Sequence, residues 1–151
     1  METALKKTLA LALDIDRFMR LIHVNLHPKA QAIDEQKVGP LGGMVLMTIA
    51  ENERLSIQDL TRQLARDKAQ MTRLIQLLER KELLLRTRLP DDARVSLVSL
   101  TSEGHALVAS FQDALADVVE DLLSGVNAEE RKQFSATLRK ILMTQEISND
   151  E

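Results

Sequence analysis

The chain has 151 residues and a net charge of −3, so it is long enough for one domain with a sizeable core and gives no overall sign of a nucleic-acid partner. It contains no Cys, which excludes disulfides, thiolate metal sites, thiol nucleophiles and cysteine-based oxidant sensing. Only 2% of the residues are aromatic, all of them Phe, so the core has to be built from aliphatic residues and Met, as is common in helical proteins.

The N-terminal region is expected to be helical over residues 4–26, where Leu and Ala occur on more than one side of the helix. Pro28 is expected to end or kink this helix, because proline lacks the backbone donor and clashes with the preceding turn. Residues 29–36 can resume as a short helical piece, and the glycines and proline of residues 39–43 predict a break. A compact apolar helix is expected over residues 44–50.

The same N-terminal region argues against a secreted or membrane-spanning chain. Its apolar residues are interrupted by Lys6, Lys7, Asp14 and Asp16, so it lacks the apolar core of a signal peptide. No uncharged apolar run in the sequence approaches the ~18–20 residues that span a bilayer. A cytoplasmic location without membrane attachment is therefore expected.

Residues 55–82 have the spacing of a helix-turn-helix. Ser56 is expected to cap the first helix, with Asp59 three residues further on in a capping-box-like position. The buried stripe of that helix is expected to be Ile57, Leu60 and Leu64.

The second helix of this unit is expected to begin after Asp67, which is a second N-cap. Its inner face holds Met71, Leu74, Ile75 and Leu78. The outer face of its first turns holds small, polar or cationic side chains suited to base edges and phosphates, namely Lys68, Ala69, Gln70, Thr72, Arg73 and Gln76. In a helix-turn-helix this helix enters the DNA major groove, although an ordinary solvated helix face has the same polar pattern.

Residues 83–89 and 95–100 are rich in aliphatic residues and Thr, and residues 90–94 (PDDAR) between them predict a turn. Together they predict a β-hairpin, the wing of a winged helix. Arg86, Arg88 and Arg94 are expected along one edge, where a hairpin can follow the DNA backbone and place an Arg in the minor groove. Asp92 is close enough to Arg94 to pair with it and fix the turn, although a surface ion pair alone contributes only about 0–1 kcal/mol.

Charge is unevenly distributed along the chain. Residues 54–94 hold ten Lys and Arg against six Asp and Glu, a net charge of +4, and the remaining residues carry −7. A basic lobe within an acidic chain is the electrostatic footprint of a nucleic-acid-binding protein.

Two further helices are expected at the C-terminal end. Residues 101–103 open the first, whose apolar seam is Leu107, Phe111, Leu115, Val118 and Leu122. Gly125 ends it, and Asn127 with Glu130 forms a capping-box pattern for the second. The apolar stripe of the second is Phe134, Leu138, Ile141 and Leu142.

These features resemble the MarR family of bacterial winged-helix regulators, most clearly over residues 57–107. Residues 90–94 (PDDAR) followed by residues 98–104 (VSLTSEG) are similar to the family's wing, with its Asp-x-Arg tip, and the Leu-Thr-x-x-Gly helix start after it. Residues 67–75 (DKAQMTRLI) are similar to its recognition helix. Two departures are Glu82, where the family usually has Gly, and Ala93, where an Arg is frequent.

The resemblance implies a homodimer that binds a pseudo-palindromic operator in double-stranded DNA. The implied organisation is a single domain over residues 1–151, with a winged-helix DNA-binding lobe at residues 37–100 and dimerisation helices at residues 1–36 and 101–147. The expected fold class is mainly α with a small β-hairpin wing. The residues themselves also favour a dimer, because the first helix and the C-terminal stripes have more apolar surface than one small winged domain can cover.

Many members of the family bind small aromatic ligands between the dimer helices and the DNA-binding lobes, which implies a small aromatic effector. The candidate residues for such a site are His23, His27, Met44 and Met47. A Met at helical spacing is more often core filling. Two His residues are too few for a metal site, so neither a metal ion nor a cofactor is expected.

No catalytic residues are expected, because the sequence has no glycine-rich phosphate loop, no HExxH motif and no Ser motif with a placed base. The predicted function is transcriptional regulation by sequence-specific DNA binding, as a repressor that a small-molecule ligand can relieve. The alternative is a winged-helix protein–protein interaction module that does not bind DNA. The two functions differ in how strongly the binding affinity depends on salt concentration, because each contact with a DNA phosphate releases counterions.

Overall fold

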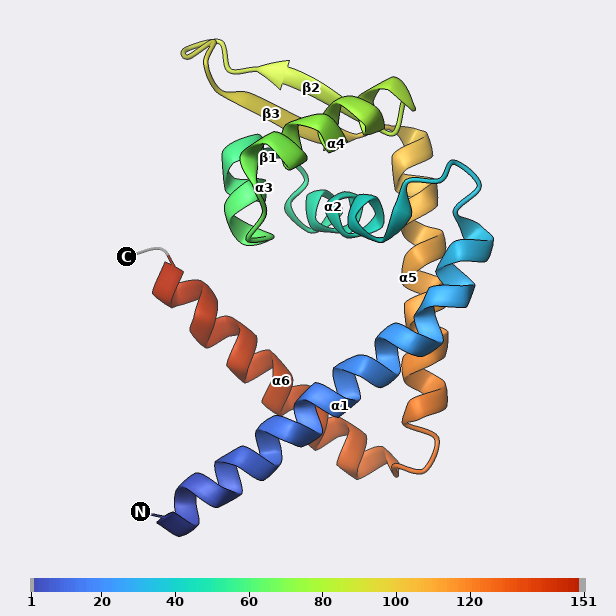
Figure 1. The fold of residues 1–151 in the computed structure, drawn as a ribbon, viewed down its shortest axis with the longest axis vertical. Helices are drawn as coiled ribbons and strands as arrows, with labels where there is room; N and C mark the ends of the chain where they lie inside the picture. The colour runs from blue at the N-terminus through green and yellow to red at the C-terminus, as the bar shows by residue number, and fades with distance from the viewer. Residues whose placement is uncertain (1, 150–151) are drawn as a thin grey trace. The chain divides into compact units, whose positions relative to one another are not determined.

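The computed structural model describes residues 2–149 and consists of helices and a small antiparallel sheet (Figure 1). The mainly helical class with a β-hairpin wing is therefore confirmed. The elements are α1 (Glu2–Ile33), α2 (Gly39–Asn52), β1 (Leu55–Ser56), α3 (Ile57–Gln63), α4 (Lys68–Arg80), β2 (Leu84–Arg88), β3 (Ser96–Leu100), α5 (Ser102–Leu122) and α6 (Ala128–Asn149). The chain forms two compact units, Met1–Leu115 and Ala116–Glu151, and the first contains the helix-turn-helix and the hairpin.

The sheet contains the predicted hairpin and one additional strand. Within the described residues it has three antiparallel strands in the order β1-β3-β2. β2 pairs with β3 from Leu84 opposite Leu100 to Arg88 opposite Ser96. The strand β1 was not expected, because two residues are too few to give a period-2 pattern. Since β1 covers one edge of β3, only β3 is paired on both sides, and β2 is an edge strand.

The core of the first unit lies between α2, α3, α4 and the sheet. On the inner face of α4, Met71, Ile75 and Leu78 are fully buried, as predicted, and Leu74 is partly buried. The side chains that pack with them include Val45, Leu46, Ile49, Leu60, Leu83, Leu84 and Val98. Burial of each large aliphatic side chain contributes roughly 1.5–3 kcal/mol. The core therefore fixes which face of α4 is left at the surface.

Helix α1 continues through Pro28 to Ile33, so of the two expectations for Pro28, an end or a kink, the end is wrong. A proline inside a helix removes one backbone hydrogen bond and costs about 3 kcal/mol. The turn after Pro28 is held by tertiary contacts, because Ala30 and Ile33 pack against the core of the first unit. Packing therefore overrides the local preference for a break.

Helix α2 begins at Gly39, so the predicted break over residues 39–43 is also wrong. Pro40 lies in the first turn, where its missing N–H leaves no helical hydrogen bond unmade. A Cβ atom on Gly42 would lie 2.9 Å from the Cβ atom of Val38, which is closer than two such atoms can pack. Gly42 is therefore needed because Val38 packs closely against it, and it does not mark a break in the helix.

Helix α4 ends in a left-handed residue that is not glycine. Glu82 has a φ of 59°. The N–H groups of Glu82 and Leu83 donate to the carbonyls of Glu79 and Leu78, both at 3.0 Å, which is the Schellman pattern. Helix α3 ends in the same way at Ala65, with a φ of 48°. Because left-handed backbone costs an L-residue roughly 1–2 kcal/mol, the departure from the family's Gly leaves strain at Glu82.

Glu82→Gly is expected to raise the free energy of unfolding by about 1 kcal/mol, because Gly adopts this φ without strain and keeps both backbone hydrogen bonds. Urea denaturation followed by circular dichroism measures the change. The matched control is Glu51→Gly inside α2, where the same replacement is expected to lower the free energy of unfolding by about 0.5–1 kcal/mol. Equal losses at both positions would contradict strain at Glu82.

The second unit contains the end of α5 and all of α6. The predicted capping box is confirmed: Asn127 Oδ1 accepts from the Glu130 N–H at 2.9 Å, and Glu130 Oε2 accepts from the Asn127 N–H at 3.1 Å. The apolar stripe of α6 lies at the surface, with 39–62% exposure of Phe134, Leu138, Ile141 and Leu142. In the part of the chain that the structure describes, no helix combines the length and apolarity needed to cross a membrane.

Candidate nucleic-acid interface

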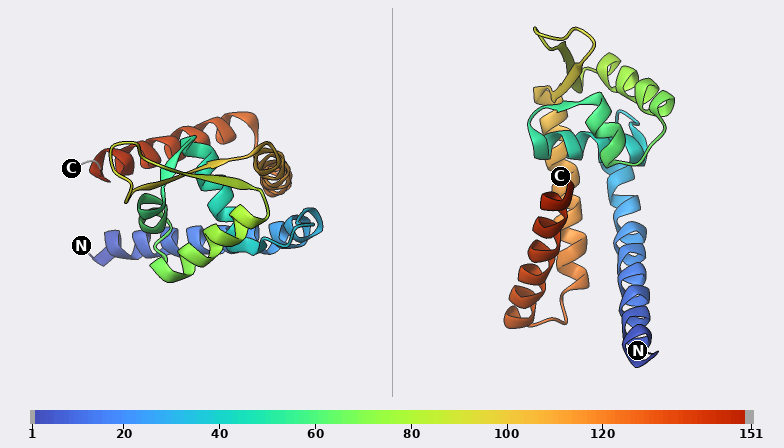
Figure 2. Two further views of the ribbon diagram at one scale, coloured as in Figure 1. Left: turned by 90° about the horizontal axis from the view of Figure 1, so that it is seen from above. Right: turned by 90° about the vertical axis from the view of Figure 1, so that its left-hand side faces the viewer.

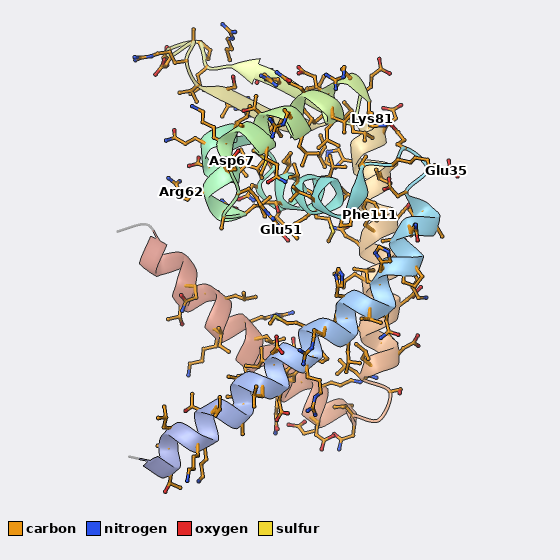
Figure 3. The ribbon with its side chains drawn as sticks, viewed as in Figure 1. Glu35, Glu51, Arg62, Asp67, Lys81 and Phe111 are labelled. Carbon is orange, nitrogen blue, oxygen red and sulfur yellow. The ribbon has the colours of Figure 1, made fainter. Side chains whose placement is uncertain are left out.

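Both helices of the helix-turn-helix begin at the predicted caps. Asp67 Oδ1 accepts from the backbone N–H of Gln70 at 2.9 Å, and Ser56 Oγ accepts from the backbone N–H of Asp59 at 3.0 Å. Figure 3 labels Asp67 and Lys81, which lie at opposite ends of α4. Because one face of α4 is buried in the core, the helix cannot turn about its axis, and its outer face keeps a fixed direction.

The outer face of α4 carries the six side chains predicted to contact DNA. Those that are exposed are Lys68, Ala69, Gln70, Arg73 and Gln76. Thr72 is partly buried, and its Oγ1 donates to the carbonyl of Lys68 at 2.8 Å. Among the described side chains, Lys68 and Arg73 make no ion pair. Two cations and two amides on one face can therefore bond to phosphates and base edges without losing an internal ion pair.

The tip of the hairpin is fixed by the predicted pair. Asp92 Oδ1 accepts from the backbone N–H of Arg94 at 3.0 Å and from its Nε–H at 3.2 Å. The Arg94 side chain is nevertheless 93% exposed. An exposed pair adds little to stability. Its effect here is geometric, because it restrains the turn and the direction of the guanidinium together.

The three arginines of the wing lie in different environments. Arg88 is exposed, like Arg94. The Arg86 side chain is only 26% exposed, and its Nη2 lies 3.4 Å from Oε2 of Glu79 on α4. Two of the three predicted cations are therefore at the surface, and the third faces the helix.

Helix α4 and the hairpin tip lie at the same end of the first unit (Figures 1 and 2). Thr101 links the end of α4 to the start of α5. Its Oγ1 donates to the carbonyl of Glu82 at 2.7 Å and accepts from the Gly104 N–H at 3.0 Å. The bond from Thr101 to Gly104 caps the helix that residues 101–103 were expected to open. The sequence did not predict the bond from Thr101 to Glu82 or the role of Glu79, because those partners lie in other elements and no spacing within one helix or strand signals them.

Comparison with known proteins agrees with this geometry. A sequence profile described as the MarR family matches residues 43–96, which include the helix-turn-helix and the wing up to the start of β3. The HTH-type transcriptional regulator YdgJ of Bacillus subtilis is 31% identical over 107 residues, which is 71% of this chain and 64% of YdgJ. The chain is therefore similar to the MarR family over its helix-turn-helix and wing.

Solved structures of the MarR family share the fold. A mutant of MepR from multidrug resistant Staphylococcus aureus is 28% identical with a TM-score of 0.75, covering 87% of this chain and 96% of that one. An S. aureus MepR mutant bound to an oligodeoxyribonucleotide is 26% identical with a TM-score of 0.60, covering 87% and 97%. The present chain spans less than two thirds of the length of YdgJ. The relatives are named as transcriptional regulators.

The chain also has a pocket of about 600 Å³, bounded by the second half of α1, the segment before α2, α2 itself and Phe111. The four residues predicted for an effector site all line it: His23, His27, Met44 and Met47. The imidazole rings have their centroids 6.2 Å apart. Glu51 and Phe111, which Figure 3 labels, add a carboxylate and an aromatic ring. Within the described residues, no three His, Asp or Glu side chains are grouped so that they could hold a metal ion.

Proposed function

We propose that this chain is a homodimeric repressor of transcription of the MarR type that binds a pseudo-palindromic operator in double-stranded DNA. The observation that carries the proposal is the exposed polar and cationic face of α4, a helix that lies at the same end of the first unit as the restrained tip of the wing. The structural relative bound to an oligodeoxyribonucleotide supports a DNA partner. A DNA partner also supports the cytoplasmic location expected from the sequence.

In this proposal α4 lies in the major groove and the wing follows the backbone. Lys68, Gln70, Arg73 and Gln76 supply bonds to phosphates and base edges, while Ala69 and Thr72 allow close approach. From the wing, Arg94 reaches the adjacent minor groove in the direction that Asp92 sets, and Arg88 contacts phosphate. The sequence also predicted Arg86 as a DNA contact, but its side chain is only 26% exposed and lies beside Glu79.

The homodimer is supported by the apolar surface of the terminal helices. In α1, the exposed large apolar side chains are Leu5, Leu9, Leu11, Leu13, Ile15, Met19, Leu21 and Val24. The stripe of α6 adds four more. Large apolar side chains exposed in such number on each of these helices favour an interface in a protein that functions in water. We therefore assign dimerisation to residues 1–36 and 101–147 and DNA binding to residues 37–100. A two-fold dimer presents its α4 helices about one DNA turn apart, roughly 34–36 Å.

Relief of repression by a small aromatic ligand belongs to the same proposal. His23, His27, Met44 and Met47 line a pocket large enough for such a compound. Its walls include Phe111 and the methionines, which suit an aromatic ring. A ligand between α1 and α2 would alter the spacing of the two α4 helices in the dimer. The proposed function is binding and release of DNA, without catalysis.

Arg73→Ala and Arg94→Ala are expected to weaken operator binding by about 1–3 kcal/mol each, because each removes a cation from the proposed interface. The operator is first selected by the wild-type protein from a pool of random duplexes. Fluorescence anisotropy then gives Kd over a range of salt concentrations. Loss of a phosphate contact should also lower the slope of log affinity against log salt by ~1.

The control is Lys132→Ala on α6, which removes an exposed cation outside the proposed interface and should leave both Kd and the salt slope unchanged. Two results would overturn the proposal: a wild-type protein that enriches no sequence, or operator affinity that is equal in wild type, Arg73→Ala and Arg94→Ala. The first of these would favour the protein–protein interaction module.

A further inference from the structure

Arg86 differs from every other cation of the proposed interface in its burial. Its side chain is 26% exposed, compared with 93% for Arg94. Its Nη2 lies 3.4 Å from Glu79 Oε2, and both Nε and Nη2 are buried without a hydrogen-bond partner in the structure. A buried guanidinium needs a countercharge, and Glu79 is the carboxylate that supplies it. Contact with a phosphate would require Arg86 to leave this partner.

The position of Arg86 along β2 gives the ion pair a mechanical consequence. β2 is an edge strand, so it is hydrogen-bonded to β3 on one side only. Its first residue, Leu84, is buried in the core, whereas Thr87 and Arg88 are exposed. Arg86 is therefore the last side chain of β2 that is anchored to the rest of the unit. Beyond Thr87, which lies opposite Leu97 and so in line with Ser56 of β1, the wing is a two-stranded ribbon, which is only marginally stable by itself.

The other half of the pair belongs to the proposed recognition helix. Glu79 lies in the last turn of α4, directly after the fully buried Leu78. Among the described residues, the Glu79–Arg86 pair is the ion pair that joins α4 to the wing. It connects the two elements whose outer surfaces are proposed to contact one DNA duplex.

We propose that Arg86 is a positioning residue for DNA binding. Paired with Glu79, it fixes the wing to α4, so that Arg94 at the tip and Arg73 on the helix approach the duplex as one rigid surface. Arg86 itself contacts no phosphate. The inference rests on the proposed DNA-binding function and adds to it the way in which the two contacting elements are kept in register.

The salt dependence of operator binding separates a positioning role from a phosphate contact. Arg86→Met keeps the length of the side chain and removes the charge, and it is expected to weaken binding on the order of 10-fold with the salt slope unchanged. Arg88→Ala is the matched control from the same strand face, and it should lower the slope by ~1. A slope lowered by ~1 in Arg86→Met would overturn the inference, because Arg86 would then be a phosphate contact.

A double-mutant cycle separates positioning from a general loss of stability. If Arg86 directs the wing, Arg94→Ala should reduce affinity less in the Arg86→Met background than in the wild type. Purely additive losses would overturn the inference. The charge-reversed variant, Glu79→Arg with Arg86→Glu, should recover affinity that either single reversal loses, and thermal melting of each variant reports folding. Failure of the wild type to bind DNA would instead remove the proposed function.

Discussion

Gly104→Ala is expected to lower the free energy of unfolding by about 3 kcal/mol, the largest effect of a single methyl group in this chain. A Cβ atom at position 104 would lie 2.0 Å from the carbonyl oxygen of Leu83, and 3.4 Å from the Cβ of Leu100. The oxygen cannot move away freely, because it accepts from the backbone N–H of Thr101 at 3.2 Å. The methyl group would therefore separate α5 from the start of β2.

Urea denaturation followed by circular dichroism measures this loss, and operator binding should fall with it because the wing begins at Leu84. Gly125→Ala is the matched control. No atom lies within 4 Å of a Cβ built at Gly125, so its stability should stay within about 0.5 kcal/mol of the wild type. If Gly104→Ala were as stable as the control, the close approach of α5 to Leu83 would be wrong.

Leu138→Glu combined with Ile141→Glu is expected to convert the proposed dimer to monomers. These side chains are 43% and 53% exposed on α6 in the single chain. In a dimer that covers them, two carboxylates would be buried without partners, at a cost of several kcal/mol. The dimer dissociation constant should rise on the order of 100-fold or more, which corresponds to about 2.7 kcal/mol. Operator affinity should fall as well, because a monomer reaches only one half-site.

Analytical ultracentrifugation measures the mass, which should change from twice 17.0 kDa to 17.0 kDa. Lys140→Glu introduces a carboxylate on the same helix, about 160° around the axis from Leu138 and Leu142 and about 100° from Ile141 at 100° per residue, and should remain dimeric. A monomeric wild type would refute the assignment of α6 to dimerisation, and so would a double variant that stays dimeric. Circular dichroism checks that the helices remain folded in each variant.

Much of the candidate DNA-binding surface could be predicted from the sequence because it depends on short-range geometry. The caps at Ser56, Asp67 and Asn127 are each made by a bond to a residue three positions later. The bond between Asp92 and Arg94 spans two positions. The 3.6-residue period of α4 assigned its buried side chains, and this in turn assigned its outer face. In all these cases the atoms that interact lie within one turn of the chain.

Other features were decided only by tertiary structure. The sequence predicted an end or a kink of the first helix at Pro28, but the helix continues to Ile33, where contacts of Ala30 and Ile33 with the core hold its last turn. The sequence predicted the three wing arginines as one row, but Glu79 on α4 holds Arg86 apart from Arg88 and Arg94.

Sequence alone therefore determined the helix-turn-helix, the hairpin, their caps and the outer face of α4. Tertiary structure decided where α1 and α2 begin and end, why Gly104 has no room for a side chain, and which of the wing's cations is left at the surface. The physical reason is that hydrogen-bonded turns and helical periods are set by neighbouring residues. Steric limits and buried charges depend on atoms that the fold brings from other elements.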